Sequence, residues 1–203
     1  MIRYWLVKIL GALCRVLPPK ISYAVASWGA DITYLLWSKG RAGLQQHLAQ
    51  ILDGDVREEE TRRKARQVLR NYYKYAVDFL RTPLLSDEDI QKLVTFQGWE
   101  NLDNALAEGK GAILVGLHMG SWDLGGAVIA SRRYPLNVVA DSFNHSKLNR
   151  AMQRFRTRRG MRVLPSRSSV DNMVQVLRRN ELLAVLIDRP HYKGGVTVEF
   201  LKR

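Results

Sequence analysis

The sequence predicts an α/β fold in which a mixed, largely parallel sheet is flanked by helices and follows an N-terminal helical, membrane-associating region. Two observations lead to this prediction. From about residue 93, short apolar runs typical of buried strands alternate with longer runs of helical periodicity. Before that point the chain contains only helix-like segments. We therefore expect one structural domain with two regions: 1–92, helical, and 93–203, an α/β core that is truncated at its C-terminus.

The helical region is divided by proline and by changes in periodicity. Pro18-Pro19 ends a first helix, because proline cannot continue the helical hydrogen-bond ladder. An apolar segment follows over 21–37, and a further helix over 39–55. The clearest helix covers 58–80, because its apolar residues fall on one face and three glutamates favour its N-terminus.

The α/β core is predicted from alternating strand-like and helix-like runs. We expect strands at 94–97, 112–117, 137–140, 161–164, 182–187 and 196–200. We expect helices at 100–107, 124–132, 147–159 and 170–179, with Gly109 and Gly160 near two of their C-terminal ends. In sheets of this kind, ligands bind at the carboxyl ends of the strands.

The N-terminal segment mixes apolar, aromatic and basic side chains. Residues 1–17 include three basic residues, so this run is too short and too interrupted to span a bilayer. It also lacks a signal-peptidase-like cleavage site. Aromatic residues in this region favour an interfacial anchor, and the alternative is an ordinary core helix with exposed basic residues. These aromatic residues are Tyr4, Trp5, Trp28, Tyr34 and Trp37.

The charge of the chain favours anionic partners. Its formal net charge is +13 and its isoelectric point is about 10.2. Eight basic residues and no acidic residue lie between Ser142 and Val170. Phospholipid head groups, phosphorylated substrates, acidic carrier proteins and nucleic acid all fit such a field. The single cysteine, Cys14, allows neither a disulfide within the chain nor a cysteine-based metal site.

His118 and Asp123 form the strongest candidate for catalysis. His118 follows the apolar run 112–117, and Asp123 falls in the first turn of the next predicted helix. A carboxylate on one ring nitrogen fixes the tautomer, while the other nitrogen accepts a proton. The backbone N–H groups of Gly120 and Ser121 are expected at the helix N-terminus, where they could stabilise an oxyanion.

Three alternatives remain for this motif. His118 could be a satisfied core histidine, or it could bind zinc with Asp123 and His145, although that spacing is not a recognised ligand pattern. We expect no metal. Ser121 does not lie in a Gly-x-Ser-x-Gly elbow, so direct attack by a substrate hydroxyl is favoured over an acyl-enzyme.

Further candidates for substrate binding surround this pair. Arg156 and Arg158 lie in the basic helix, and arginine suits phosphate because its planar fork donates two hydrogen bonds at once. Asp141, Asp188 and Arg189 follow predicted strands and should reach the same sheet edge as His118. The alternatives are a solvated basic face for the arginines and a purely structural Asp188–Arg189 pair.

Ordered sequence blocks give the chain a family resemblance. The blocks are Phe96-Gln97-Gly98-Trp99-Glu100-Asn101-Leu102, Glu108-Gly109-Lys110-Gly111-Ala112-Ile113-Leu114, His118-Met119-Gly120-Ser121-Trp122-Asp123, Leu186-Ile187-Asp188-Arg189 and Gly195-Val196-Thr197-Val198-Glu199-Phe200. Together they resemble the bacterial lipid A biosynthesis (lauroyl/myristoyl) acyltransferase family, within the lysophospholipid acyltransferase superfamily. That family usually has Asn-Trp-Glu at 121–123, and Asp123 with Asp188-Arg189 is more similar to its phosphatidylinositol mannoside acyltransferase branch.

The resemblance implies transfer of a fatty acyl group from a thioester to a hydroxyl of a lipid-linked sugar, with His118 as general base and Asp123 as its partner. The donor would be acyl-CoA or acyl-carrier protein, and the acceptor a glycolipid of the lipid A precursor type or a phosphatidylinositol mannoside. No cofactor is implied. The place implied is the cytoplasmic face of the plasma (inner) membrane, as a peripheral or monotopic protein.

Two other functions compete with acyl transfer. A basic nucleic-acid-binding module would explain the charge, but no helix-turn-helix or RNA-reading aromatic motif supports it. An acyl-lipid hydrolase would use the same His118 to activate water instead of a substrate hydroxyl.

Overall fold

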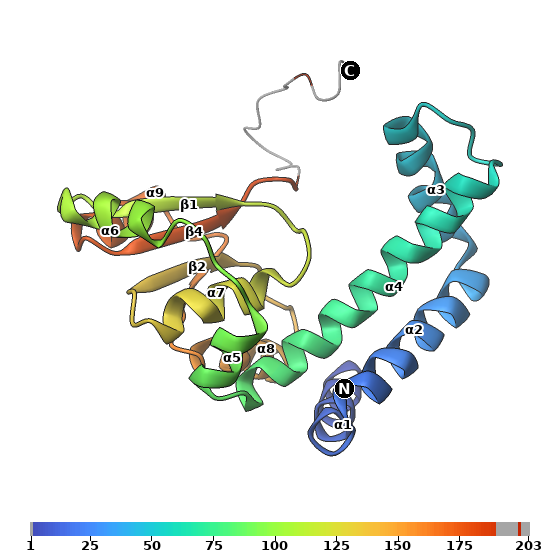
Figure 1. Cartoon of the computed structure of the whole chain (residues 1–203), viewed down its shortest axis with the longest axis horizontal. Coiled ribbons are helices and arrows are strands. Elements are labelled where there is room, and N and C mark those ends of the chain that lie inside the picture. The colour runs from blue at the N-terminus through green and yellow to red at the C-terminus, as the bar shows by residue number, and fades with distance from the viewer. Residues whose placement is uncertain (1, 190–198, 200–203) are drawn as a thin grey trace. The chain divides into compact units, whose positions relative to one another are not determined.

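The computed structural model describes residues 2–189 and Glu199 (Figure 1). Contacts divide the chain into two compact units. Among the described residues, the first contains 2–15 and 78–189, and the second contains 16–77 and Glu199. The long helix α4 (Glu59–Arg81) contributes its last turn to the first unit and the rest to the second.

In the second unit, α2 (Pro19–Leu36) contacts α4 through small and polar side chains. Helix α3 (Ser38–Leu52) follows α2 in the chain. Asp31 on α2 accepts hydrogen bonds of 2.5–2.7 Å from Arg66 and Arg70 on α4. The hydroxyl groups of Thr33 and Tyr73 lie 2.6 Å apart. These contacts leave the apolar stripe of α2 exposed, and it consists of Ile21, Val25, Trp28, Ile32, Leu35 and Leu36.

Helix α1 (Ile2–Val16) lies in the first unit up to Arg15 and is also exposed along an apolar face. Its inner side is fixed by Arg81, which donates a hydrogen bond of 2.7 Å to the carbonyl oxygen of Cys14. Its outer face presents Trp5, Leu6, Ile9, Leu10 and Leu13. No helix in the described residues is long and apolar enough to cross a bilayer.

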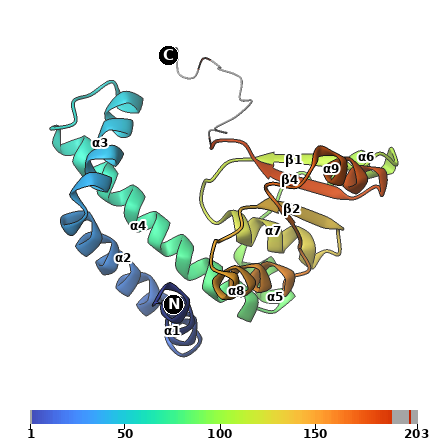
Figure 2. The same cartoon turned by 180° about the vertical axis from the view of Figure 1, so that it is seen from behind.

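The first unit is built on a parallel sheet with the strand order β1-β4-β2-β3. The strands are β1 (Ala112–Gly116), β2 (Leu136–Ala140), β3 (Arg162–Pro165) and β4 (Leu182–Leu186). The last strand of the described residues, β4, therefore lies between β1 and β2, as Figures 1 and 2 show. A largely parallel sheet flanked by helices is thus confirmed, and every strand pair among the described residues is parallel.

The core of this unit lies between the sheet and three helices, α5 (Asp87–Leu93), α6 (Trp99–Ala107) and α7 (Trp122–Ser131). Two further helices, α8 (Ser146–Thr157) and α9 (Val170–Arg178), complete the strand connections. The buried residues that form the core are Ile90, Leu102, Ala127, Val128, Leu136, Met161 and Leu182.

One predicted element differs from the structure, and another falls outside the described residues. Residues 94–97 form an extended connection instead of a strand, and α5, which the sequence analysis missed, precedes them. The alternating Val94 and Phe96 pack against the core, and Phe96 stacks on Trp99 with ring centroids 4.0 Å apart. The predicted strand at 196–200 falls outside the described residues except for Glu199.

Candidate active site

The register of β1 and β4 places His118 beside Asp188. Gly116 is paired with Leu186, and the two candidate residues each follow two positions later. The Nδ1 atom of His118 lies 2.7 Å from Oδ1 of Asp188. The backbone N–H of His118 donates to Oδ2 of the same carboxylate at 2.8 Å. One carboxylate therefore holds both the ring and the backbone of His118.

This contact selects one tautomer of the His118 ring. An ionised carboxylate can only accept hydrogen bonds, so Nδ1 of His118 carries the proton and Nε2 becomes the acceptor. The side chains of His118 and Asp188 are 23% and 33% exposed. Burial raises the pKa of Asp188. The hydrogen bonds from the ring and backbone of His118 lower this pKa by more, so it lies below its ordinary value.

Asp123 has a partner that the sequence did not predict. Its Oδ1 accepts a 2.7 Å hydrogen bond from Nε of Arg156, and its Oδ2 accepts a 3.4 Å bond from Nη2. Asp123 is only 6% exposed, and the Arg156 side chain is 14% exposed. Asp188 thus bonds the His118 ring, which the sequence did not predict, and orientation of this ring by Asp123 stays a prediction.

The contact with Asp123 also occupies the guanidinium of Arg156. This guanidinium was expected to bind a phosphate, but it is engaged with Asp123 and with Oε1 of Gln153 at 3.1 Å. Arg158, two positions later on a helix of 3.6 residues per turn, faces elsewhere and is exposed. The structure therefore places Arg156 inside the fold and leaves Arg158 as an accessible cation.

The turn between β1 and α7 carries the remaining residues of the motif. Gly120 has φ +62°, a backbone conformation that favours glycine. Ser121 is the N-cap of α7, and its Oγ is buried with no hydrogen-bond partner among the described residues. The ring of Trp122 meets the His118 ring edge-on, with centroids 4.9 Å apart. Stabilisation of an oxyanion by Gly120 and Ser121 remains a prediction.

The sheet edge also brings Asp141 and Arg189 together. Asp141 follows β2, Arg189 follows β4, and Nη1 of Arg189 lies 3.6 Å from Oδ2 of Asp141. Both side chains are exposed. Hence Asp141, Asp188 and Arg189 do reach the edge that carries His118, as their positions after strands predicted.

The described residues show no group of three side chains that could hold a metal ion. His145, considered as a zinc ligand, has its Nδ1 3.4 Å from the backbone N–H of Leu148 and caps α8. A zinc site formed by His118, Asp123 and His145 therefore gains no support from these positions.

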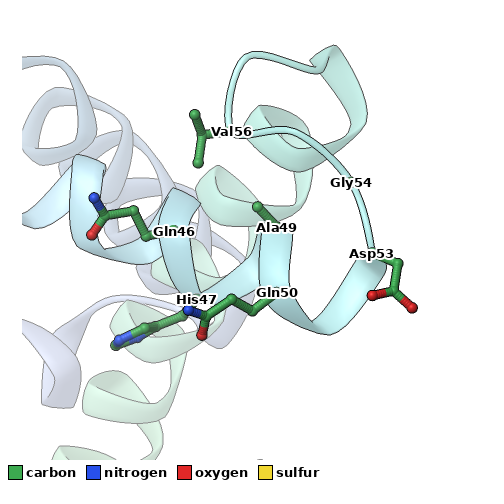
Figure 3. A pocket seen from close by; sticks show the side chains of 7 residues that line it. All are labelled: Gln46, His47, Ala49, Gln50, Asp53, Gly54 and Val56. Carbon is green, nitrogen blue, oxygen red and sulfur yellow. The ribbon is translucent and has the colours of Figure 1, made fainter. Parts of the chain in front are cut away.

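A hollow of about 610 Å³ lies in the second unit, on α3 and the loop that follows it. Its lining is mostly polar and includes His47 and Asp53. Figure 3 shows the His47 and Asp53 side chains at different parts of this lining.

Comparison with known proteins identifies the family of this chain. A family model described as bacterial lipid A biosynthesis acyltransferase matches residues 1–203. The chain belongs to this acyltransferase family. Within curated proteins, the phosphatidylinositol mannoside acyltransferase of Mycolicibacterium smegmatis is 25% identical over 195 residues, which make up 93% of this chain and 62% of that protein.

The proteins of the same name from two strains of Mycobacterium tuberculosis are 28% identical over 138 residues. This match covers 65% of the present chain and 44% of each of those proteins. The acyltransferase chain thus spans less than two-thirds of the length of these relatives. The matches confirm the family predicted from the sequence blocks and the branch that Asp123 and Asp188-Arg189 indicated.

Sequence reasoning missed the contact between His118 and Asp188. A usable signal was present, because Asp188 directly follows the apolar run 182–187, just as His118 directly follows 112–117. What the sequence lacked was the strand order, which makes these two runs neighbours.

Proposed function

We propose that this protein is a membrane-associated O-acyltransferase that moves a fatty acyl group from a thioester to a hydroxyl group of a glycolipid. The observation that carries the proposal is the His118–Asp188 pair at the carboxyl edge of the sheet. A glycolipid of the phosphatidylinositol mannoside type is favoured as acceptor over a lipid A precursor, because the curated relatives carry the former name.

The pair supports general-base catalysis. Nε2 of His118 takes the proton of the acceptor hydroxyl as its oxygen attacks the thioester carbon. The carbon–sulfur bond then breaks, and the departing thiolate receives the proton from the imidazolium. Asp188 stabilises the positive charge that His118 carries between these steps. General-base assistance of this kind contributes on the order of 10²- to 10⁴-fold in rate.

The acyl donor is acyl-CoA or acyl-carrier protein. Both carry phosphate, and the exposed cations Arg158 and Arg189 are suited to bind it. Asp141 beside Arg189 would compete with that phosphate or bind a hydroxyl group of the acceptor. Offering each donor separately distinguishes the two sources.

A lipid surface is the proposed location, with the cytoplasmic face of the inner membrane as the expected one. Helices α1 and α2 each expose an apolar stripe, and Trp5, Trp28 and Trp37 are all more than half exposed. Tyr34, which the sequence analysis grouped with them, instead donates a hydrogen bond to the carbonyl oxygen of Arg62. Interfacial helices of this kind lie in the plane of the head groups.

The deciding experiment incubates the whole chain with labelled acyl-CoA or acyl-carrier protein, phosphatidylinositol mannosides and lipid A precursors, and identifies products by mass. His118→Ala should abolish acylation of the lipid, whereas His47→Ala, an exposed histidine in the second unit, should not. Full activity of His118→Ala would refute the proposal. Release of free fatty acid without acylated lipid would indicate a hydrolase instead.

The nucleic-acid alternative makes a separate prediction. A binding module would retain salt-sensitive binding of DNA or RNA after His118→Ala, since phosphate contacts do not need the imidazole. Such binding without any lipid product would favour that alternative.

A further inference from the structure

We propose that Phe79 is a positioning residue: its ring holds the guanidinium of Arg156 against Asp123 and thereby fixes the start of α7 beside His118. The inference rests on the proposed acyl transfer and adds a residue outside the sequence blocks. Phe79 lies in the last turn of α4, within the first unit, and is 4% exposed.

The Phe79 ring has two aromatic or cationic neighbours on α8. Cζ of Arg156 lies 5.4 Å from the ring centroid, within the range of a cation–π contact. The ring of Phe155 meets it in an edge-on arrangement, with centroids 5.3 Å apart and an interplanar angle of 75°. The two contacts differ in the partner of the ring: Arg156 brings a full positive charge to it, whereas Phe155 contributes a neutral ring in an edge-on pair.

The ring supplies a restraint that the carboxylate alone does not. Arg156 donates one short hydrogen bond to Asp123, from Nε at 2.7 Å, and one long bond, from Nη2 at 3.4 Å. Because the guanidinium is planar and rigid, a ring beneath it limits rotation about the short bond. The bond from Nη1 to Gln153, at 3.1 Å, limits the same rotation from the other end of the fork.

Asp123 transmits this restraint to the catalytic histidine. It lies in the first turn of α7 and is nearly fully buried, so a shift of its carboxylate moves the helix start with it. The preceding residue, Trp122, touches the His118 ring with centroids 4.9 Å apart. Loss of the restraint should therefore reduce turnover more than it weakens substrate binding.

A fluorinated phenylalanine series at position 79 tests the proposal. Replacing Phe79 by 4-fluoro-, 3,5-difluoro- and 3,4,5-trifluorophenylalanine weakens the ring quadrupole in steps while changing the shape little. We expect kcat of acyl transfer to fall with each step, by about 3- to 10-fold at the trifluoro stage, with KM nearly constant. The same series at Phe155 is the matched control and should leave kcat unchanged, because no arginine lies over that ring in the described contacts.

A flat kcat across the Phe79 series would overturn the proposal. Equal losses at Phe79 and Phe155 would also overturn it, since packing alone would explain them. A double-mutant cycle of Phe79→Leu and Arg156→Lys, read by thermal unfolding, does not depend on activity. If the unmodified protein transfers no acyl group, the proposed function fails. In that case, the two substitutions are compared by their effects on unfolding. A double-mutant effect that differs from the sum of the single effects would support the Phe79–Arg156 contact, and an effect equal to that sum would reject it.

Discussion

Replacing Asp188 by Asn tests the central contact of the site with little change in shape. The carboxylate accepts two hydrogen bonds, from Nδ1 and from the backbone N–H of His118. An amide has only one accepting oxygen. If that oxygen receives the backbone N–H, the amide NH₂ faces Nδ1 and forces the proton onto Nε2, which then cannot act as a base. If it receives Nδ1–H instead, two N–H donors oppose each other.

The expected loss in kcat has two sources, the lost hydrogen-bond acceptor and the changed tautomer of His118. In the serine protease triad, the equivalent change lowers kcat by about 10⁴-fold because the wrong tautomer is stabilised. Here Asp188 and His118 are 33% and 23% exposed, so water can replace part of the lost interaction. We therefore expect a smaller loss in kcat, of about 10²- to 10³-fold, or roughly 3–4 kcal/mol in the activation free energy.

The assay is the initial rate of acylated lipid formation at saturating donor, measured from pH 5 to 9. The matched control is Asp171→Asn, which removes an exposed carboxylate in the first turn of α9 and should leave the rate unchanged. An Asp188→Asn variant that folds and keeps its rate within about 3-fold would refute the assignment of Asp188 as the orienting carboxylate.

Two further predictions concern the stability of the first unit. The pKa of Glu181 is about 2, because hydrogen bonds from Arg179, Asn137 and Arg162 outweigh burial, which raises it. The stabilisation by the ionised Glu181 is thus complete above pH 4.5 and is lost as the pH falls toward 2. Glu181→Gln should therefore lower the unfolding free energy by about 1–2 kcal/mol at pH 7. Urea titrations should show this difference shrinking below pH 4.5. Gly111→Ala should destabilise by about 2–4 kcal/mol in urea unfolding, because an added Cβ would lie 2.7 Å from the carbonyl oxygen of Glu181 at φ +69°. Gly109→Ala, at φ +72° with open space around it, should lose only about 1 kcal/mol, and equal losses at both positions would contradict the steric argument.

The four strands of the sheet and most helices were predictable because each of them carries its own signal. The run 112–117 is apolar and bounded by glycine, and β1 covers Ala112–Gly116. The proline pair at 18–19 separates α1 from α2. Where the pattern was short, at 94–97, alternation alone suggested a strand that has no ladder partner in the structure. Short alternating runs are ambiguous, because a connection that packs one face on a core shows the same period.

The site was less predictable, because its contacts depend on the order of strands and on competition between partners. Asp123 is the nearest acid to His118 in the chain, which made it the natural choice from sequence. In the fold, Arg156 on α8 approaches Asp123, and β4 brings Asp188 to the histidine. Neither approach follows from local spacing, since both join segments that are far apart in the chain.

Asp123 and Asp188 contact different partners, and this difference matters for the proposed catalysis. Asp123 faces a guanidinium that is charged before, during and after acyl transfer, so its electrostatic interaction is equal in the ground state and the transition state. Asp188 faces a ring that gains a positive charge only when it takes the substrate proton. Because only interactions that strengthen in the transition state accelerate the chemical step, the proposed mechanism assigns the electrostatic contribution to Asp188. In the proposed mechanism Asp123 therefore acts by its position, which Arg156 and Phe79 hold.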